Sequence, residues 1–182
     1  KVGASAVEEM NDGNEAYDSE EEREFSNDEL ELFSDFMYSK KMRHQILDAI
    51  DLISLEPYVG NVIITGESGT GVIELAKDVI KEIQMIDSNF AANKVAKISG
   101  AKMNRKNIGS MFTQLSNGAL IIEKAGELSK DTLENMTKVL ESTQEGIIVI
   151  MTDSKREMEQ LIKSYEVITG YFNARIDITP MN

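Results

Sequence analysis

Short apolar runs alternate with amphipathic stretches from about residue 60 to the end of the chain. The apolar runs lie at residues 61–65, 94–99, 119–123, 146–152 and 174–178. Between them, apolar residues recur every three or four positions over residues 71–86, 104–116, 130–141 and 155–163. A recurrence near 3.6 predicts helices, and short continuous apolar runs are typical of parallel strands buried on both faces. The alternation therefore predicts an α/β sandwich with a mainly parallel sheet.

The first part of the chain has a different pattern. Residues 1–25 are acidic, poor in large apolar residues and without a period, so they predict a linker or a disordered tail before an α/β domain at 26–182. Ser26 and Glu29 have the spacing of a capping box, which predicts the start of a helix. A second helix is expected over residues 40–54, where the apolar positions again have helical spacing.

The charge of the chain is concentrated in this first segment. The 182 residues carry a formal net charge of −13. Residues 1–35 hold 13 acidic and 2 basic residues, a net of −11, and residues 36–182 hold 19 acidic and 17 basic residues, a net of −2. A nearly neutral domain without a basic stripe leads us to expect no nucleic-acid partner.

Cysteine and hydropathy bear on where the protein works. The sequence has no cysteine and no apolar run of membrane-spanning length, so we expect a cytoplasmic protein with no membrane partner. The chain begins at Lys1 rather than Met, and we expect it to be a fragment of a longer protein.

A glycine-rich turn follows the first apolar run. Its residues are Gly66, Glu67, Ser68, Gly69, Thr70, Gly71, Val72 and Ile73. The glycines match the phosphate-binding loop G-x-x-x-x-G-K-[ST], but Val72 and Ile73 stand where lysine and a hydroxyl residue would follow. Lysine contacts the terminal phosphates and the hydroxyl binds Mg²⁺, and neither Val nor Ile can do this. Ligand-free turns of this kind are common, but the strand-to-helix context favours a vestigial phosphate loop.

A second motif occupies residues 118–129 and ends its apolar run in Glu123 and Lys124. P-loop ATPases place a Mg²⁺-binding Asp and a catalytic Glu at the end of such a strand. Lys124 cannot act as a base for water at neutral pH unless it is strongly desolvated. The alternative is an ordinary strand followed by a charged loop.

Taken together, these segments resemble the AAA+ ATPases, in particular the bacterial subgroup of rubisco-activase-like and stage V sporulation protein K relatives. Residues 118–128 are similar to the subgroup pattern G-[VA]-L-F-I-D-E-A-Y-x-L, and residues 147–159 to V-V-I-L-A-G-Y-x-x-E-M-E. Residues 165–172 fall where the family has N-P-G-L-x-S-R-F, and residues 98–101 match its segment I-S-G-A. The resemblance covers roughly residues 35–180.

The resemblance implies a three-layer core with strand order 5-1-4-3-2 and a missing C-terminal helical lid. It places Val72 and Ile73 at the lysine and threonine positions, Glu123 and Lys124 at the two acid positions, and Tyr171 at the position of the arginine finger. Each departure removes charge stabilisation or water activation that phosphoryl transfer requires. We therefore expect no catalytic residue and no metal site.

Three functional hypotheses follow. The first is a non-catalytic pseudo-ATPase module with a structural or protein-interaction role in a larger bacterial protein, whose partner is an active AAA+ domain or another copy of itself. The second is a regulatory domain that binds ATP or ADP weakly without hydrolysis, and a remote third is an active ATPase that uses Lys124 and Arg175. A cofactor is not expected under the first hypothesis.

We also hypothesise that Lys124 forms an ion pair with Glu67 or Glu123. The alternative is that its side chain points into water.

Overall fold

The computed structural model describes residues 23–57 and 59–181, so most of the expected linker lies outside the described residues. The chain divides after Glu31 into two units, which are described separately. In the first unit, Ser26 N donates to Glu29 Oε1 at 2.9 Å and Glu29 N donates to Ser26 Oγ at 3.1 Å. This reciprocal pair confirms the capping box, and helix α2 (Asn27–Leu32) begins directly after Ser26.

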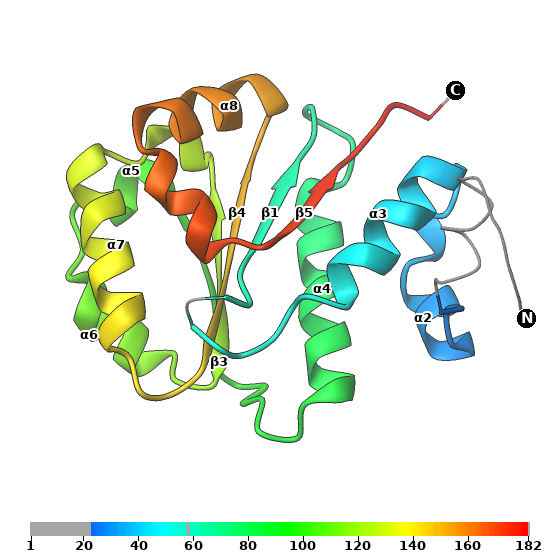
Figure 1. Cartoon of the computed structure of the whole chain (residues 1–182), viewed down its shortest axis with the longest axis horizontal. Helices are drawn as coiled ribbons and strands as arrows, with labels where there is room; N and C mark the ends of the chain where they lie inside the picture. The colour runs from blue at the N-terminus through cyan, green and yellow to red at the C-terminus, as the bar shows by residue number, and fades with distance from the viewer. Residues whose placement is uncertain (1–22, 58, 182) are drawn as a thin grey trace, which may run out of the picture. The chain divides into compact units, whose positions relative to one another are not determined.

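The second unit contains a five-stranded sheet in which every strand pairs in parallel (Figure 1). Its strands are β1 (Val62–Thr65), β2 (Val95–Ser99), β3 (Gly118–Glu123), β4 (Ile147–Asp153) and β5 (Ala174–Asp177). Their order is β2-β3-β4-β1-β5, which confirms the expected order and places β1 between β4 and β5. Because the strands are parallel, all five carboxyl ends lie at one edge of the sheet, where ligands of this fold class bind.

Helices cover both faces of this sheet. They are α3 (Lys40–Ile50), α4 (Val72–Ile86), α5 (Gly100–Met103), α6 (Ile108–Gln114), α7 (Lys130–Ser142) and α8 (Lys155–Ser164), with 3₁₀ turns η1 (Ser34–Phe36), η2 (Ala125–Glu127) and η3 (Glu166–Tyr171). Figure 1 shows α4 on one side of the strands and α6, α7 and α8 on the other. Leu75, Val79 and Ile83 of α4 are fully buried at helical spacing, as the sequence pattern predicts.

The helix predicted over 104–116 is shorter in the structure, and a short helix that was not predicted precedes it. The structure has α5 over Gly100–Met103, a turn over residues 104–107, and then α6 over Ile108–Gln114. The side chain of Asn107 accepts a hydrogen bond from Ser110 N at 2.9 Å and caps α6. Ser99 likewise caps α5 by accepting from Lys102 N at 3.2 Å. Each capping side chain satisfies a backbone N–H in the first turn of its helix, so Ser99 and Asn107 mark where α5 and α6 begin.

Candidate functional site

A cavity of about 1020 Å³ lies at the carboxyl edge of the sheet. Its lining comes from the η1 turn, the glycine-rich loop, the start of α4, β2 and the ends of β3 and β4: Asp35, Phe36, Gly66, Glu67, Ser68, Gly69, Thr70, Gly71, Val72, Ile73, Glu74, Lys77, Lys97, Glu123, Lys124, Thr152, Asp153 and Ser154. All eight predicted loop residues and both residues of the second motif are present. The fold therefore brings the two motifs into one cavity.

The glycine-rich loop has the backbone shape that an anion site needs. Gly69 and Gly71 both lie in the left-handed region, with φ of 87° and 89°. Gly71 directly precedes α4, whose first-turn N–H groups have no partner within the helix. Successive N–H groups at a helix start favour a phosphate or carboxylate. The loop thus places two left-handed glycines directly before the start of a helix, and its role as a vestigial phosphate loop stays a prediction.

The side chain at the lysine position makes the start of this loop apolar. A Cβ atom added to Gly66 would lie 2.7 Å from Val72 Cγ2 and 2.6 Å from Thr70 Oγ1. The valine side chain thus packs against the first glycine of the loop, and no cation is available there. Thr70 Oγ1 donates to Glu67 O at 2.6 Å, which uses the hydroxyl inside the loop itself.

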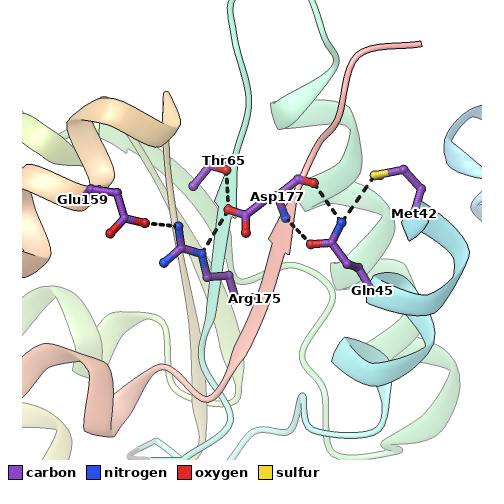
Figure 2. A network of polar contacts seen from close by, with 6 residues as sticks. All are labelled: Met42, Gln45, Thr65, Glu159, Arg175 and Asp177. Atoms are coloured by element: carbon purple, nitrogen blue, oxygen red, sulfur yellow. Dashed lines mark hydrogen bonds and ion pairs between the residues drawn. The ribbon is translucent and has the colours of Figure 1, made fainter. Parts of the chain in front are cut away.

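The loop is held by both strands that flank β1. On the β4 side, Gly66 N donates to Asp153 O at 3.1 Å. On the β5 side, Thr65 Oγ1 donates to Asp177 Oδ1 at 2.6 Å, as Figure 2 shows. Ile178 N also donates to Thr65 O at 2.8 Å. These bonds fix the point at which β1 turns into the loop.

Arg175 extends the same polar network, which Figure 2 draws. Its Nε donates to Asp177 Oδ1 at 3.0 Å and its Nη2 donates to Glu159 Oε2 at 2.6 Å. Burial acts to lower the pKa of Arg175, but the hydrogen bonds to Glu159 and Asp177 outweigh it and raise that pKa. Arg175 is therefore engaged by two carboxylates of its own domain and is absent from the cavity lining.

The charged side chains around the cavity are mostly acidic. The cations are Lys77, Lys97 and Lys124, and the anions are Asp35, Glu67, Glu74, Glu123 and Asp153. Three positive and five negative charges give the lining a formal net charge of −2. The negative electrostatic potential of such a lining opposes the binding of a nucleoside triphosphate, which is strongly anionic.

Glu123 pairs with a lysine from the neighbouring strand. Lys97 Nζ lies 3.5 Å from Glu123 Oε2, and the two side chains are 47% and 38% exposed. Lys97 stands opposite Ile121, so Glu123, two residues further along β3, lies on the same face as its diagonal neighbour. An exposed pair of this kind stabilises the fold by less than about 1 kcal/mol.

Lys124 does not form the expected pair. It is exposed, has φ of 50°, and makes no ion pair among residues 23–57 and 59–181. The left-handed backbone turns the chain away from the line of β3, while the Lys124 carbonyl accepts Glu127 N at 3.0 Å. The hypothesis that Lys124 pairs with Glu67 or Glu123 is therefore wrong, and the alternative that it faces solvent holds.

Tyr171, at the arginine-finger position, is not among the residues that line the cavity. It ends η3, and its hydroxyl donates a hydrogen bond to Glu141 Oε2 of α7. This bond is the main cause that raises the pKa of Tyr171 to about 12. The hydroxyl is thus held against its own domain, and its role as a vestigial finger stays a prediction.

Eight of the residues that line the cavity were missed by the sequence analysis: Asp35, Phe36, Glu74, Lys77, Lys97, Thr152, Asp153 and Ser154. At the end of β4, Thr152 Oγ1 donates to Ile122 O at 3.0 Å, while Asp153 Oδ2 accepts Gly126 N at 2.8 Å. Asp153 therefore ties the second motif to the strand beside β1. The available signal was the position of both residues at the carboxyl end of a predicted strand.

The comparisons with known proteins support the fold. No protein-family model matches the sequence, and the comparison with curated proteins gives no significant match. Among solved structures, the chain is similar to the P-loop NTPase domain of the sigma-54 transport activator from E. coli, with a TM-score of 0.54, 11% identity, and coverage of 77% of this chain and 93% of that one. It is also similar to NtrX from Brucella abortus, with a TM-score of 0.51, 11% identity, and coverage of 98% of this chain and 47% of that one.

A third similar structure is the Aeropyrum pernix ORC1 protein in complex with DNA, with a TM-score of 0.49, 14% identity, and coverage of 85% of this chain and 50% of that one. The chain spans about half the length of NtrX and of ORC1. Identities this low show the fold alone: the domain has the fold of a P-loop NTPase domain.

The comparisons leave the partner expectations largely open. No helix within the described residues is both long and apolar enough to cross a bilayer. The expectation that the chain binds no nucleic acid stays a prediction, as does its cytoplasmic location.

Proposed function

We propose that this domain is a non-catalytic AAA+-like module with a structural or protein-interaction role in a larger bacterial protein. The observation that carries the proposal is the cavity lining. Val72 and Ile73, which the motif spacing aligns with the phosphate-lysine and metal-hydroxyl positions, both line the cavity, and the charged groups of the lining sum to −2. The cavity thus retains the shape of a nucleotide site without its cationic character.

The chemistry of the lining argues against hydrolysis. The missing lysine removes a charge-assisted contact of about 1.5–3 kcal/mol with the phosphates. Lys124, at the base position, is an ammonium group with three donors and no acceptor for the proton of an attacking water. Without a hydroxyl at residue 73, the loop also lacks its Mg²⁺ ligand.

Weak nucleotide binding without hydrolysis is the second candidate, because the loop backbone favours it. Gly69 and Gly71 keep the left-handed conformations that aim N–H groups at an anion, and the cavity volume of about 1020 Å³ is large enough for a nucleotide. Under this alternative, ATP or ADP would act as a regulatory ligand held by the backbone alone.

The resemblance to rubisco-activase-like and stage V sporulation protein K relatives suggests the kind of assembly. Domains of this type act on one another side by side, so an active AAA+ domain or a second copy of this chain is the proposed partner. Tyr171 in place of the finger arginine fits a subunit that gives no catalytic help to its neighbour. No metal and no tightly held cofactor are part of this proposal.

Thermal unfolding with and without Mg-ATP and Mg-ADP tests the function. A ligand present at 100 times its Kd adds about 2.7 kcal/mol to the free energy of unfolding, which is visible as a shifted midpoint. We expect no shift at millimolar nucleotide for the native chain. A clear shift would establish the nucleotide-binding alternative instead.

The double variant Val72→Lys, Ile73→Thr is the matched control. It restores the cation and the hydroxyl, so we expect Mg-ATP to raise its midpoint while turnover stays negligible. If Mg-ATP left the melting midpoint of the double variant unchanged, the loop would not be a phosphate site in this fold.

A further inference from the structure

A basic segment runs along one margin of the domain. Residues 94–106, called the basic edge here, hold five Lys or Arg residues and no Asp or Glu. They span β2, α5 and the turn that follows. Lys97, Lys102, Arg105 and Lys106 are exposed, and Lys94 is half-buried. The net charge of −2 over residues 36–182 averages these cations with acidic residues elsewhere, so it did not reveal the basic edge. The expectation that the domain has no basic stripe is therefore wrong.

These cations are largely uncompensated. Among the described residues, Lys97 alone of the five forms an ion pair, with Glu123 at 3.5 Å. Clustered cations without partners create a positive potential that attracts anionic groups and raises their association rate. The basic edge is therefore suited to an acidic partner.

The same segment presents an open strand edge. Strand β2 is the last in the order β2-β3-β4-β1-β5, with no strand beyond it in the described residues. Val95 pairs with Ala119, and Ala119 N donates to Lys94 O at 2.9 Å. Since backbone groups alternate along a strand, the N–H and C=O groups of Val95 and Lys97 point away from β3.

Side chains on this strand divide between the core and solvent. Ala96 and Ile98 pack against the core cluster under α6 and α7. Val95 and Lys97 lie on the other face, and Val95 is 43% exposed. An apolar side chain beside a cation, next to unpaired backbone groups, matches an extended peptide in which acidic and apolar residues alternate.

We propose that β2 and the basic edge bind an extended acidic segment of a partner protein by strand addition. Backbone hydrogen bonds form along Val95 and Lys97, and the acidic side chains of the segment pair with the lysines and Arg105. This role does not depend on whether the cavity binds nucleotide.

A peptide fits this surface better than nucleic acid does. Residues 94–106 contain no aromatic side chain on which unpaired bases could stack. Helix α5 has four residues, too few to enter a major groove and present base-reading side chains. Strand addition also requires the unpaired backbone N–H and C=O groups of β2, whereas binding of a nucleic-acid phosphate backbone does not.

Fluorescence anisotropy with a labelled peptide of alternating Glu and Val, long enough to span β2, tests the proposal on the full chain. The variant K102E/K106E reverses two charges outside the cavity lining. Its matched control, K138E/K163E, makes the same charge change on exposed lysines of α7 and α8. We expect the first pair to weaken binding by about tenfold or more, and the control by much less.

The variant Val95→Pro isolates the strand edge. Proline removes an N–H that points to the open side, a position where edge strands tolerate it. We expect weaker peptide binding with an unchanged melting midpoint. No binding of the peptide to the native chain would overturn the proposal. Equal loss in both double variants, no effect of Val95→Pro, or tighter binding of single-stranded DNA than of the peptide would also overturn it.

Discussion

The two left-handed glycines of the loop differ in their surroundings. A Cβ added to Gly71 would lie 3.2 Å from Phe36 Cζ, whereas one added to Gly69 would meet nothing within 4 Å. The left-handed backbone costs a non-glycine residue about 1–2 kcal/mol, and the contact with Phe36 adds to this. We predict that Gly71→Ala destabilises the fold more than Gly69→Ala, as measured by denaturant unfolding. Equal losses would show that Phe36 moves aside freely.

Asp78 of α4 gives stability a dependence on pH. Burial, followed by the nearby charges of Asp35 and Glu74, raises its pKa from 3.8 to about 6, although Lys81 acts to lower it. The folded carboxyl therefore holds its proton more tightly than the unfolded one, and the contribution of Asp78 to stability is lost as the pH rises from about 4 to about 6.

We predict that Asp78→Asn stabilises the protein above pH 6 and has little effect below pH 4. Because the side chain is only partly buried, the gain should be about 1 kcal/mol, less than the full shift implies. Unfolding curves across this pH range provide the measurement, with Glu145→Gln as the control for loss of one surface carboxylate. A gain of equal size at all pH values would contradict the account.

Sequence alone predicted which residues line the cavity at the two motifs but not the contacts that these residues make. Val72, Ile73 and Lys124 were identified from motif spacing, which is a local property of the chain. The pair between Lys97 and Glu123 depends on the register of β2 against β3, and no local pattern specifies that register. For that reason the sequence hypothesis paired Lys124 with Glu67 or Glu123, and the pair between Lys97 and Glu123 was missed.

At the scale of elements, α3 covers the outer edge of β5, where the side-chain amide of Gln45 makes the two backbone hydrogen bonds that a neighbouring strand would make. Gln45 Nε2 donates to Asp177 O at 2.9 Å, and Asp177 N donates to Gln45 Oε1 at 2.8 Å (Figure 2). Without these bonds both backbone groups of Asp177 lose their partner. This contrasts with β2, beyond whose outer edge the described part of the chain places no further strand.

We predict that Gln45→Ala destabilises the domain by about 1–2 kcal/mol, the combined contribution of two hydrogen bonds. Gln84→Ala, on the exposed side of α4, is the matched control and should change stability by a few tenths of a kcal/mol. If Gln45→Ala were as mild as Gln84→Ala, water would be replacing the amide at the edge.

The strands were predictable to within a residue or two because buried parallel strands are uniformly apolar, and polar residues mark where they end. Helices whose ends coincide with capping residues, such as α7 after Ser129, were equally well predicted. The short helix α5 and the later start of α6 were missed, because apolar spacing alone does not show that Asn107 caps α6.

At the scale of the whole domain, the parallel sheet decides which residues meet. Asp35, Lys77, Lys97 and Asp153 come from four separate segments and converge at the carboxyl edge. The formal net charge of −2 belongs to the whole lining and emerges only from this convergence. The strongest argument against binding of a nucleoside triphosphate therefore could not be read from any single motif. The family resemblance supplied the strand order, and the structure supplied the charge balance.

The central claim is that the cavity keeps the shape of an ATPase site without the capacity to hydrolyse ATP. Phosphate release from Mg-ATP by the purified full chain tests it most directly, beside a Ser68→Glu variant that adds a negative charge at an exposed position of the loop. We predict that both proteins release phosphate at the background rate. The account would be contradicted by ATPase activity that co-elutes with the native protein in size-exclusion chromatography and is absent from the Ser68→Glu variant.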